Sequence, residues 1–382
     1  SNMSQLAELI LRQNKISSLE QATFGDLLSL QELDLGGNCI FRVDKRLFFA
    51  LKRLKTLKLD QNLIREISPV TILSPLHMLQ HLNLSSNLIE RFVASRSLAN
   101  ESPLQRLTLL DLSFNLLLRE VDITALGRVY HLGLDGNRKV EKLNATFSNL
   151  NSLSLNEFAS IHTNFLLSKM KVNNLIELSL SQNAAGYVQY TEIISLGQRT
   201  LQKLALVAMG KTLSLELFDH MDFLKEIDIS TNRIEEFTAA TKTRNQPLVF
   251  LRSSLDLQVL KASGLGLTND MLDEHFQLSI FIELEHLDLS RNSLQYIPNG
   301  LLAWNSKLTR LVLSNNRLVD LGSSSTLDNL AYLARLDLSG NLLARLQVGN
   351  MKSLQRLKSL ELGSNRIELI EYKRTLFFIE IL

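Results

Sequence analysis

The sequence has 382 residues, of which 45% are hydrophobic, and 41 Lys and Arg against 39 Asp and Glu leave a formal net charge of +2. This balance excludes the basic excess of a protein that works by neutralising nucleic-acid phosphates. No run of about eighteen apolar residues predicts a membrane-spanning helix. The single cysteine, Cys39, excludes an internal disulfide and a cysteine-based zinc site. Leucine supplies 85 residues, which indicates one pattern written many times.

The first residues, Ser1-Asn2-Met3, read as a protease-cleavage remnant followed by an added start, so residues 1–5 are expected to be a tag remnant and lead-in. The repeat L-x-x-L-x-L-x-x-N then begins at Leu6 and places its Asn at position 14. The later Asn positions are Asn38, Asn62, Asn87, Asn115, Asn137, Asn183, Asn232, Asn292, Asn316, Asn341 and Asn365. Three further copies carry Phe158, Met209 and Leu265 in that slot, which makes fifteen repeats.

Each repeat predicts one short strand, because the two leucines of L-x-L lie one strand period apart and face the same side. One repeat cannot bury its leucine face, so neighbouring repeats must stack, with parallel strands paired along the array. The Asn side chain is expected to cap backbone groups at the bend after each strand. The central outward-facing column is Ile10, Asp34, Lys58, Asn83, Asp111, Gly133, Ser154, Ser179, Ala205, Asp228, Lys261, Asp288, Val312, Asp337 and Glu361.

The second half of the repeat carries a recurrent Phe, which predicts a buried aromatic spine on the convex side at Phe24, Phe48, Phe147 and Phe218. This is the leucine-rich repeat signature, and the 24-residue form with Phe resembles the repeats of Toll-like receptor and chaoptin-like ectodomains. The resemblance implies an α/β solenoid, a horseshoe with a parallel β-sheet on its concave face. It places short helical or irregular segments on the convex face.

Residues 6–382 are therefore expected to form a single solenoid. Polar stretches that widen the repeat predict inserted loops near 93–103 and 238–256, and Lys242 and Arg244 of the second loop are candidate partner contacts. A solvated loop without a partner is the alternative. The relatives implied by the resemblance close their ends with cysteine clusters, which this chain lacks, so we expect a fragment without its terminal caps.

The exposed sheet face is the candidate binding surface. Asp in L-D-L-S is common in this repeat class, so Asp111, Asp228, Asp288 and Asp337 are expected to be generic. The small residues from Gly133 to Ala205 leave apolar neighbours exposed, which indicates an interaction site unless distortion around the three degenerate repeats hides them. The candidate ligand-binding residues are Lys58, His81, Leu109, Phe114, Tyr130, His131, Lys203 and Val207.

Other chemistry finds little support in the sequence. His81 and His131 stand two repeats apart with Leu109 between them, so no third metal ligand completes the pair. No catalytic triad or phosphate-binding motif occurs, so the sequence predicts neither an enzyme nor a cofactor. Cys39 is expected to be a packed or half-buried thiol.

Three sequons occur within the repeats, at Asn83, Asn100 and Asn144. Asn100 and Asn144 are the expected glycan acceptors, whereas Asn83 lies on the sheet.

Three functions remain open at this point. The first is a recognition module of a cell-surface receptor or adhesion protein, which binds a protein ligand or co-receptor outside the cell. The second is a cytosolic scaffold or regulatory subunit, which the lone cysteine and Met3 favour. The third is a structural adhesion protein whose array self-associates into a homo-oligomer through exposed ends.

Overall fold

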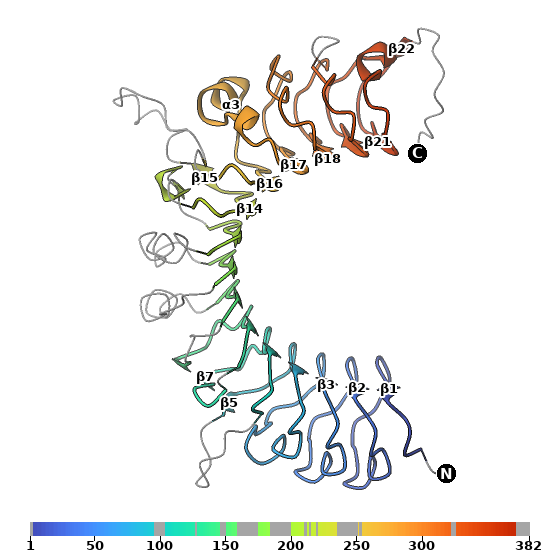
Figure 1. The fold of residues 1–382 in the computed structure, drawn as a ribbon, viewed down its shortest axis with the longest axis vertical. Helices are drawn as coiled ribbons and strands as arrows, with labels where there is room; N and C mark the ends of the chain where they lie inside the picture. The colour runs from blue at the N-terminus through green and yellow to red at the C-terminus, as the bar shows by residue number, and fades with distance from the viewer. Residues whose placement is uncertain are drawn as a thin grey trace. The chain divides into compact units, whose positions relative to one another are not determined.

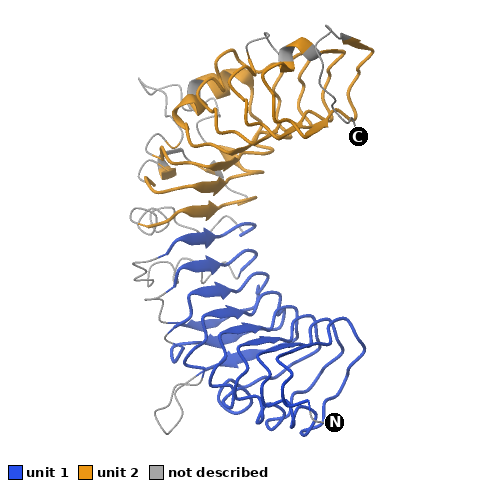
Figure 2. Cartoon of the chain, turned by 45° about the vertical axis from the view of Figure 1, so that its right-hand side comes forward, with its two compact units in different colours: residues 1–192 blue, residues 193–382 orange. Residues whose placement is uncertain are grey.

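The computed structural model describes residues 3–94, 104–126, 128–145, 150–158, 175–183, 200–209, 212–213, 215–218, 221–234, 251, 254–321 and 326–371. Within these ranges each repeat contributes one short strand to a parallel sheet (Figure 1). Two compact units divide the chain, residues 1–192 and 193–382 (Figure 2). Most of both predicted loops, with Asn100, Lys242 and Arg244, lies outside the described residues. No helix in the described ranges has the length and apolarity to cross a membrane.

Unit 1 contains eight strands of the main sheet, each of three residues and each paired in parallel with its neighbour in register. They are β1 (Glu8–Ile10), β2 (Glu32–Asp34), β3 (Thr56–Lys58), β4 (His81–Asn83), β6 (Leu109–Asp111), β8 (His131–Gly133), β10 (Ser152–Ser154) and β11 (Glu177–Ser179). The sheet lies on the inner side of the unit's own curve (Figure 1).

Unit 2 repeats this arrangement with seven strands. They are β12 (Lys203–Ala205), β14 (Glu226–Asp228), β16 (Val259–Lys261), β17 (His286–Asp288), β18 (Arg310–Val312), β19 (Arg335–Asp337) and β21 (Ser359–Glu361). All fifteen strands contain the predicted central-column residue as their third member. The leucine-rich repeat solenoid predicted from the sequence is therefore confirmed.

On the opposite side of the repeats, the described residues hold short helices and more strand than the sequence predicts. The helices among the described residues are α3 (Asn269–His275) and the 3-10 turns η1 (Leu215–Phe218), η4 (Leu278–Ile280) and η5 (Val348–Met351). Small parallel sheets join β5 (Arg91–Val93), β7 (Glu120–Asp122) and β9 (Lys142–Asn144), then β13 (Thr212–Leu213) and β15 (Arg233–Ile234), then β20 (Arg345–Gln347) and β22 (Leu369–Glu371). Extended chain at equivalent points of adjacent repeats pairs because stacking brings it to one strand spacing.

The core is built from the repeated leucines and phenylalanines. Leu54, Leu57 and Leu59 of the third repeat are fully buried, and equivalent leucines are buried along both units. Each stabilises the fold by about 1.5–3 kcal/mol relative to an exposed side chain. Phe24, Phe48 and Phe218 are buried as predicted, and Phe147 lies outside the described residues.

A ladder of asparagine side chains satisfies the backbone at the bends. Asn62 donates from Nδ2 to the carbonyls of Leu35, Leu59 and Asp60 at 3.0, 3.1 and 3.1 Å. Its Oδ1 accepts the N–H of Ile40, in the preceding repeat, at 3.0 Å. One amide therefore replaces water for four buried backbone groups and links two repeats.

Every bend also uses one left-handed residue. In all fifteen repeats the residue before the Asn slot has a positive φ between 49° and 72°, and only four of the fifteen are glycines. Phe114, with φ of 57°, is the bulkiest. Non-glycine residues rarely adopt this conformation, so the repeated hydrogen bonds must offset the strain.

The three repeats without Asn keep the same bend. Glu157, Ala208 and Gly264 retain φ of 49°, 51° and 66°. The N–H groups of Phe158, Met209 and Leu265 are accepted by the Asn of the following repeat at 2.9, 2.8 and 3.0 Å. The expectation of local distortion is thus wrong for these bends, because the next repeat's amide supplies the missing partner.

Candidate functional site

The acidic residues of the central column are structural. Asp111, Asp228, Asp288 and Asp337 each accept the backbone N–H two residues further on at 2.9 to 3.1 Å. This bond caps the end of the strand in the manner of an Asx turn. This shared structural role supports the prediction that these aspartates are generic. The neighbouring residues of the sheet are therefore the better candidates for a binding surface.

A row of three predicted residues lies across adjacent strands of unit 1. His81 of β4 is in register with Leu109 of β6, and Leu109 is in register with His131 of β8. Both histidines are exposed and Leu109 is half-buried. Parallel neighbours are about 4.8 Å apart, so these three side chains form a continuous surface.

Tyr130 extends this row. It directly precedes β8, is 38% exposed, and its N–H donates to the carbonyl of Thr108 at 2.8 Å, which holds it beside the β6 strand. An aromatic ring with a hydroxyl handle suits a protein interface because it buries large area at low entropic cost. We name His81, Leu109, Tyr130 and His131 the histidine-tyrosine row.

Phe114 is not part of that row. It stands at the bend after β6, 49% exposed, so the polar residues Asp111, at the end of the strand, and Ser113, after it, separate it from Leu109. A Cβ added to Gly136 would come within 2.5 Å of the Phe114 ring carbon Cδ1. The ring therefore lies over the glycine of the next bend, and the predicted apolar patch divides into two.

Lys58 belongs to a separate network of charges near the start of the chain. Its Nζ lies 2.7 Å from Glu32 Oε1 and 3.8 Å from Asp34 Oδ2. The hydrogen bond to Glu32 is the main reason that the pKa of Lys58 is raised above its ordinary value. Lys58 is thus held by its own fold and is less available to a ligand than the sequence predicted.

The same network contains a contact that the sequence analysis missed. Arg12 reaches across the second repeat and donates to both carboxylate oxygens of Asp60 at 2.7 and 3.1 Å. The hydrogen bond to Asp60 raises the pKa of Arg12 above its ordinary value. Gly36 makes this possible, since a Cβ there would lie 2.2 Å from Arg12 Nη1.

The remaining predicted residues lie in unit 2. Lys203 of β12 is exposed and pairs with Glu226 of β14, with 3.0 Å between Nζ and Oε1. Val207, four residues later, is half-buried. Lys203 is exposed on its strand, and ligand binding by Lys203 and Val207 stays a prediction. Asn144, at the end of β9, is exposed on the small second sheet of unit 1.

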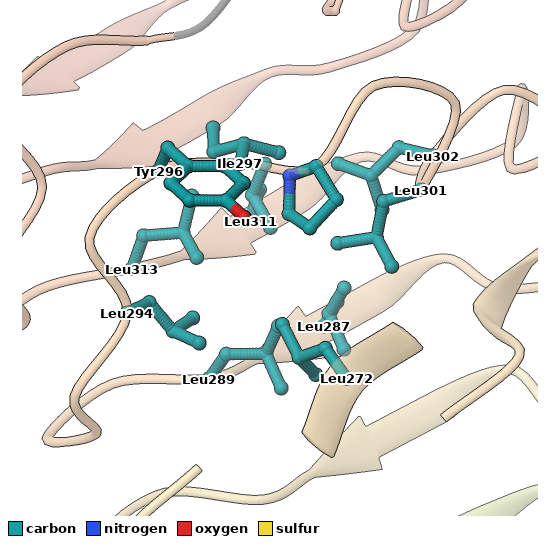
Figure 3. A pocket seen from close by; sticks show the side chains of 11 residues that line it. Leu272, Leu287, Leu289, Leu294, Tyr296, Ile297, Leu301, Leu302, Leu311 and Leu313 are labelled. Carbon is teal, nitrogen blue, oxygen red and sulfur yellow. The ribbon is translucent and has the colours of Figure 1, made fainter. Parts of the chain in front are cut away.

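Metal and small-molecule sites find no support in the described part of the chain. It contains no group of three His, Cys, Asp or Glu residues that could hold a metal ion. A cavity of about 10 Å³ in unit 2 lies among core leucines, with Tyr296 and Ile297 at its rim (Figure 3). That volume is at the lower limit for one water molecule. It is a gap in the packing of three successive repeats.

Cys39 differs from its prediction. The thiol is exposed, because the residue after Asn38 lies on the outside of the bend while the Asn turns inward. Nothing in its geometry assigns it a reaction.

Together the geometry defines a class of protein, a stacked-repeat solenoid that presents the face of a parallel sheet to its surroundings. Family models described as leucine rich repeat match residues 4–64, 40–89 and 283–304. The chain is a leucine-rich repeat protein, and the asparagine ladder and buried leucines are the physical basis of that match.

Relatives with known names show how far the similarity extends. The chain is 28% identical over 391 residues to the zebrafish transforming growth factor beta activator LRRC33, covering 96% of this chain and 54% of that protein. It is 29% identical over 210 residues to chaoptin of Drosophila melanogaster, and this match covers 51% of this chain and 16% of chaoptin. The chain therefore spans about half the length of the first relative and less of the second.

Solved structures agree on the fold. The mouse RP105/MD-1 complex matches with a TM-score of 0.62 and 22% identity, covering 96% of this chain and 65% of the matched chain. The TLR13-ssRNA13 complex matches with a TM-score of 0.55 and 19% identity, covering 96% and 60%. The resemblance to Toll-like and chaoptin-like repeats is confirmed at the level of distant similarity.

Proposed function

We propose that this chain is a non-enzymatic recognition module that binds a protein ligand or co-receptor with the exposed face of its main sheet. The histidine-tyrosine row carries the proposal. Some other residues of the unit 1 sheet, such as Lys58 and Asp111, are engaged within the fold. Here two histidines, a leucine and a tyrosine lie together and face solvent.

A protein ligand fits this surface better than a nucleic acid. The TLR13 structure is a complex with single-stranded RNA, but this chain has a net charge of only +2. Nucleic-acid binding needs many unpaired cations, since each phosphate contact replaces a counterion. An exposed aliphatic and aromatic group flanked by histidines is typical of a protein interface.

We place this module on the cell surface or outside the cell. The 24-residue repeat with its buried Phe resembles Toll-like and chaoptin-like ectodomains, and chaoptin and LRRC33 are among the relatives. Exposed Asn144 supports the same location, since its sequon would be accessible to glycosylation.

Site-specific crosslinking tests the proposal. A photo-crosslinking amino acid is placed at position 109 in the main sheet, and at position 142 on the small second sheet as the matched control. With cells of the source tissue, light should attach a protein at position 109 and none at position 142. Equal attachment at both positions, or none at position 109, would refute recognition by this face.

Two variants strengthen the test. Leu109→Glu puts a charge into the centre of the row and should abolish attachment from a reporter at position 131. Because Leu109 is half-buried and its replacement could disturb the sheet, Tyr130→Ala serves as the second variant. It removes an exposed ring and should weaken binding roughly tenfold, the effect of losing a moderate interface residue. Unchanged attachment by both variants would contradict the proposal.

A further inference from the structure

A second feature of the exposed face lies in unit 2, where two arginines stand side by side. Arg310 of β18 and Arg335 of β19 are direct partners in the parallel register, and both are exposed. Their α carbons are about 4.8 Å apart, the spacing of adjacent strands. Like charges at such a distance destabilise a sheet.

The other basic residues in the strands of the main sheet have acidic partners. Lys58 pairs with Glu32 at 2.7 Å, Lys203 with Glu226 at 3.0 Å and Lys261 with Asp228 at 3.7 Å. Within the described residues Arg310 and Arg335 form no ion pair. The strands of the main sheet thus contain three lysines that pair with a carboxylate and two adjacent arginines that have no carboxylate partner among the described residues.

Nearby carboxylates do not neutralise this pair. Asp288 of the neighbouring strand β17 and Asp337 of Arg335's own strand β19 turn instead to the backbone and accept the N–H groups of Ser290 and Ser339, each at 2.9 Å. Asp337 also accepts the Ser339 hydroxyl at 2.6 Å. The carboxylates closest to the arginines therefore cap backbone N–H groups and form no ion pair with the arginines.

The next residue of the same column adds an unused polar atom. His286 of β17 is in register with Arg310, and its Nε2 is buried without a hydrogen-bond partner among the described residues. A buried polar atom without a partner costs free energy, so the unpartnered histidine nitrogen and the two like charges are unfavourable features that lie together in this column.

We propose that the column of Arg310 and Arg335, with His286 beside it, binds a carboxylate-rich segment of a protein ligand. Guanidinium groups bind carboxylates with two parallel hydrogen bonds. Acidic residues one turn apart on a helix lie about 5–6 Å from each other, which matches the spacing of the two arginines. This assignment rests on the proposed recognition of a protein and adds the chemistry of that ligand.

A long polyanion fits this column less well. The strand positions that continue the column beyond each end are Val259 and Ser359, which are uncharged. Asp288, Asp337 and Glu361 occupy the next column of the same face and would repel further negative charge. Two adjacent cations between acids select a discrete pair of carboxylates and disfavour a continuous run of sulfates or phosphates.

The test measures binding of a fluorescein-labelled helical peptide that carries two Glu residues one turn apart to the whole chain by fluorescence anisotropy. It is done at about 0.01 M ionic strength, where the Debye length is about 30 Å. The double variant Arg310→Ala and Arg335→Ala should bind the peptide at least roughly fivefold more weakly, as expected for two exposed charge pairs. The matched control removes two paired cations, Lys203→Ala and Lys261→Ala, and should change the affinity by less than about twofold.

Three outcomes would overturn the assignment. The arginine variant could bind the peptide as the parent does, the lysine control could lose as much affinity as the arginine variant, or a heparin oligosaccharide could bind through the same arginines more tightly than the peptide. Because all four residues are in unit 2, a failure here leaves crosslinking at Leu109 in unit 1 as an independent test. The two proposals can therefore fail separately.

Discussion

Replacing Asn62 with Ala tests the asparagine ladder, the feature that joins one repeat to the next. Asn62 is 5% exposed. Its side chain makes four hydrogen bonds, three donated to backbone carbonyls and one accepted from the N–H of Ile40. Alanine leaves these groups without the amide, in a space too well packed for water to enter freely.

The expected loss of stability follows from the groups left without a partner. A buried polar group that loses its partner costs about 1–3 kcal/mol. The N–H of Ile40 loses its side-chain acceptor, and the three carbonyls share the loss of one NH₂ group. We therefore expect Asn62→Ala to lower the free energy of unfolding by about 3–5 kcal/mol, a large effect for a single substitution.

Asn14 is the matched control. It occupies the same slot in the first repeat but is exposed, and it donates only to the carbonyls of Leu11 and Arg12 at 3.0 and 3.3 Å. Asn14→Ala should cost less than about 1 kcal/mol, since water replaces the amide.

Urea unfolding of the whole chain measures both variants, and amide hydrogen exchange at Ile40 reads the local effect. Equal losses in the two variants, or unchanged exchange at Ile40, would refute this account of the ladder.

Three further predictions concern other parts of the chain. Gly36→Ala should lose about 1–2 kcal/mol in urea unfolding by displacing Arg12 from Asp60, and the loss should shrink in an Arg12→Ala background; an equal loss in both backgrounds would point elsewhere. Burial, and next the nearby charge of Arg310, lower the pKa of His286 in the folded chain. As the pH falls, this histidine therefore becomes protonated in the unfolded chain before it does in the folded chain. The free energy of unfolding should consequently fall as the pH drops below about 6.5. His286→Asn should flatten this part of the urea midpoint against pH curve, and an unchanged slope would exclude His286 as the cause. Secreted from animal cells, the chain should carry a glycan at exposed Asn144 and none at Asn83, whose Oδ1 accepts from Ser85; mass spectrometry of Asn144→Gln and Asn83→Gln would decide.

The repeat made most of the fold predictable. The strand positions and the burial of Phe24 follow from periodicity, because every copy meets nearly the same surroundings. For Asp111 the sequence indicated only a generic residue, and the backbone hydrogen bond that it accepts became visible in the structure. The preserved bends at the three repeats without Asn were not predicted, because they depend on a neighbouring repeat. The N–H of Phe158, for example, donates to Asn183 of the next repeat, and the sequence of one repeat does not show this bond.

The candidate site was less predictable, because a long side chain can form its hydrogen bonds or ion pairs with residues one or two repeats away. Arg12 and Asp60 are 48 residues apart. The available signal was a column reading Arg12, Gly36 and Asp60, opposite charges with a glycine between them. The sequence makes Lys58 a candidate ligand-binding residue, because it does not show that the Glu32 side chain pairs with it. The sequence does not distinguish Arg310 and Arg335 from the other cations of the sheet, because only the structure shows that those cations are paired.

Hydroxyl-radical footprinting of the complex tests the central claim, recognition by the sheet face, most directly. The chain is oxidised with and without the protein that crosslinks at position 109, and mass spectrometry reads each side chain. Tyr130, His81 and His131 should be strongly protected by the bound protein, whereas oxidation of Tyr296, which is 45% exposed and lines the small cavity in unit 2, should be unchanged. Equal oxidation of Tyr130 in the free and bound chain would contradict that claim.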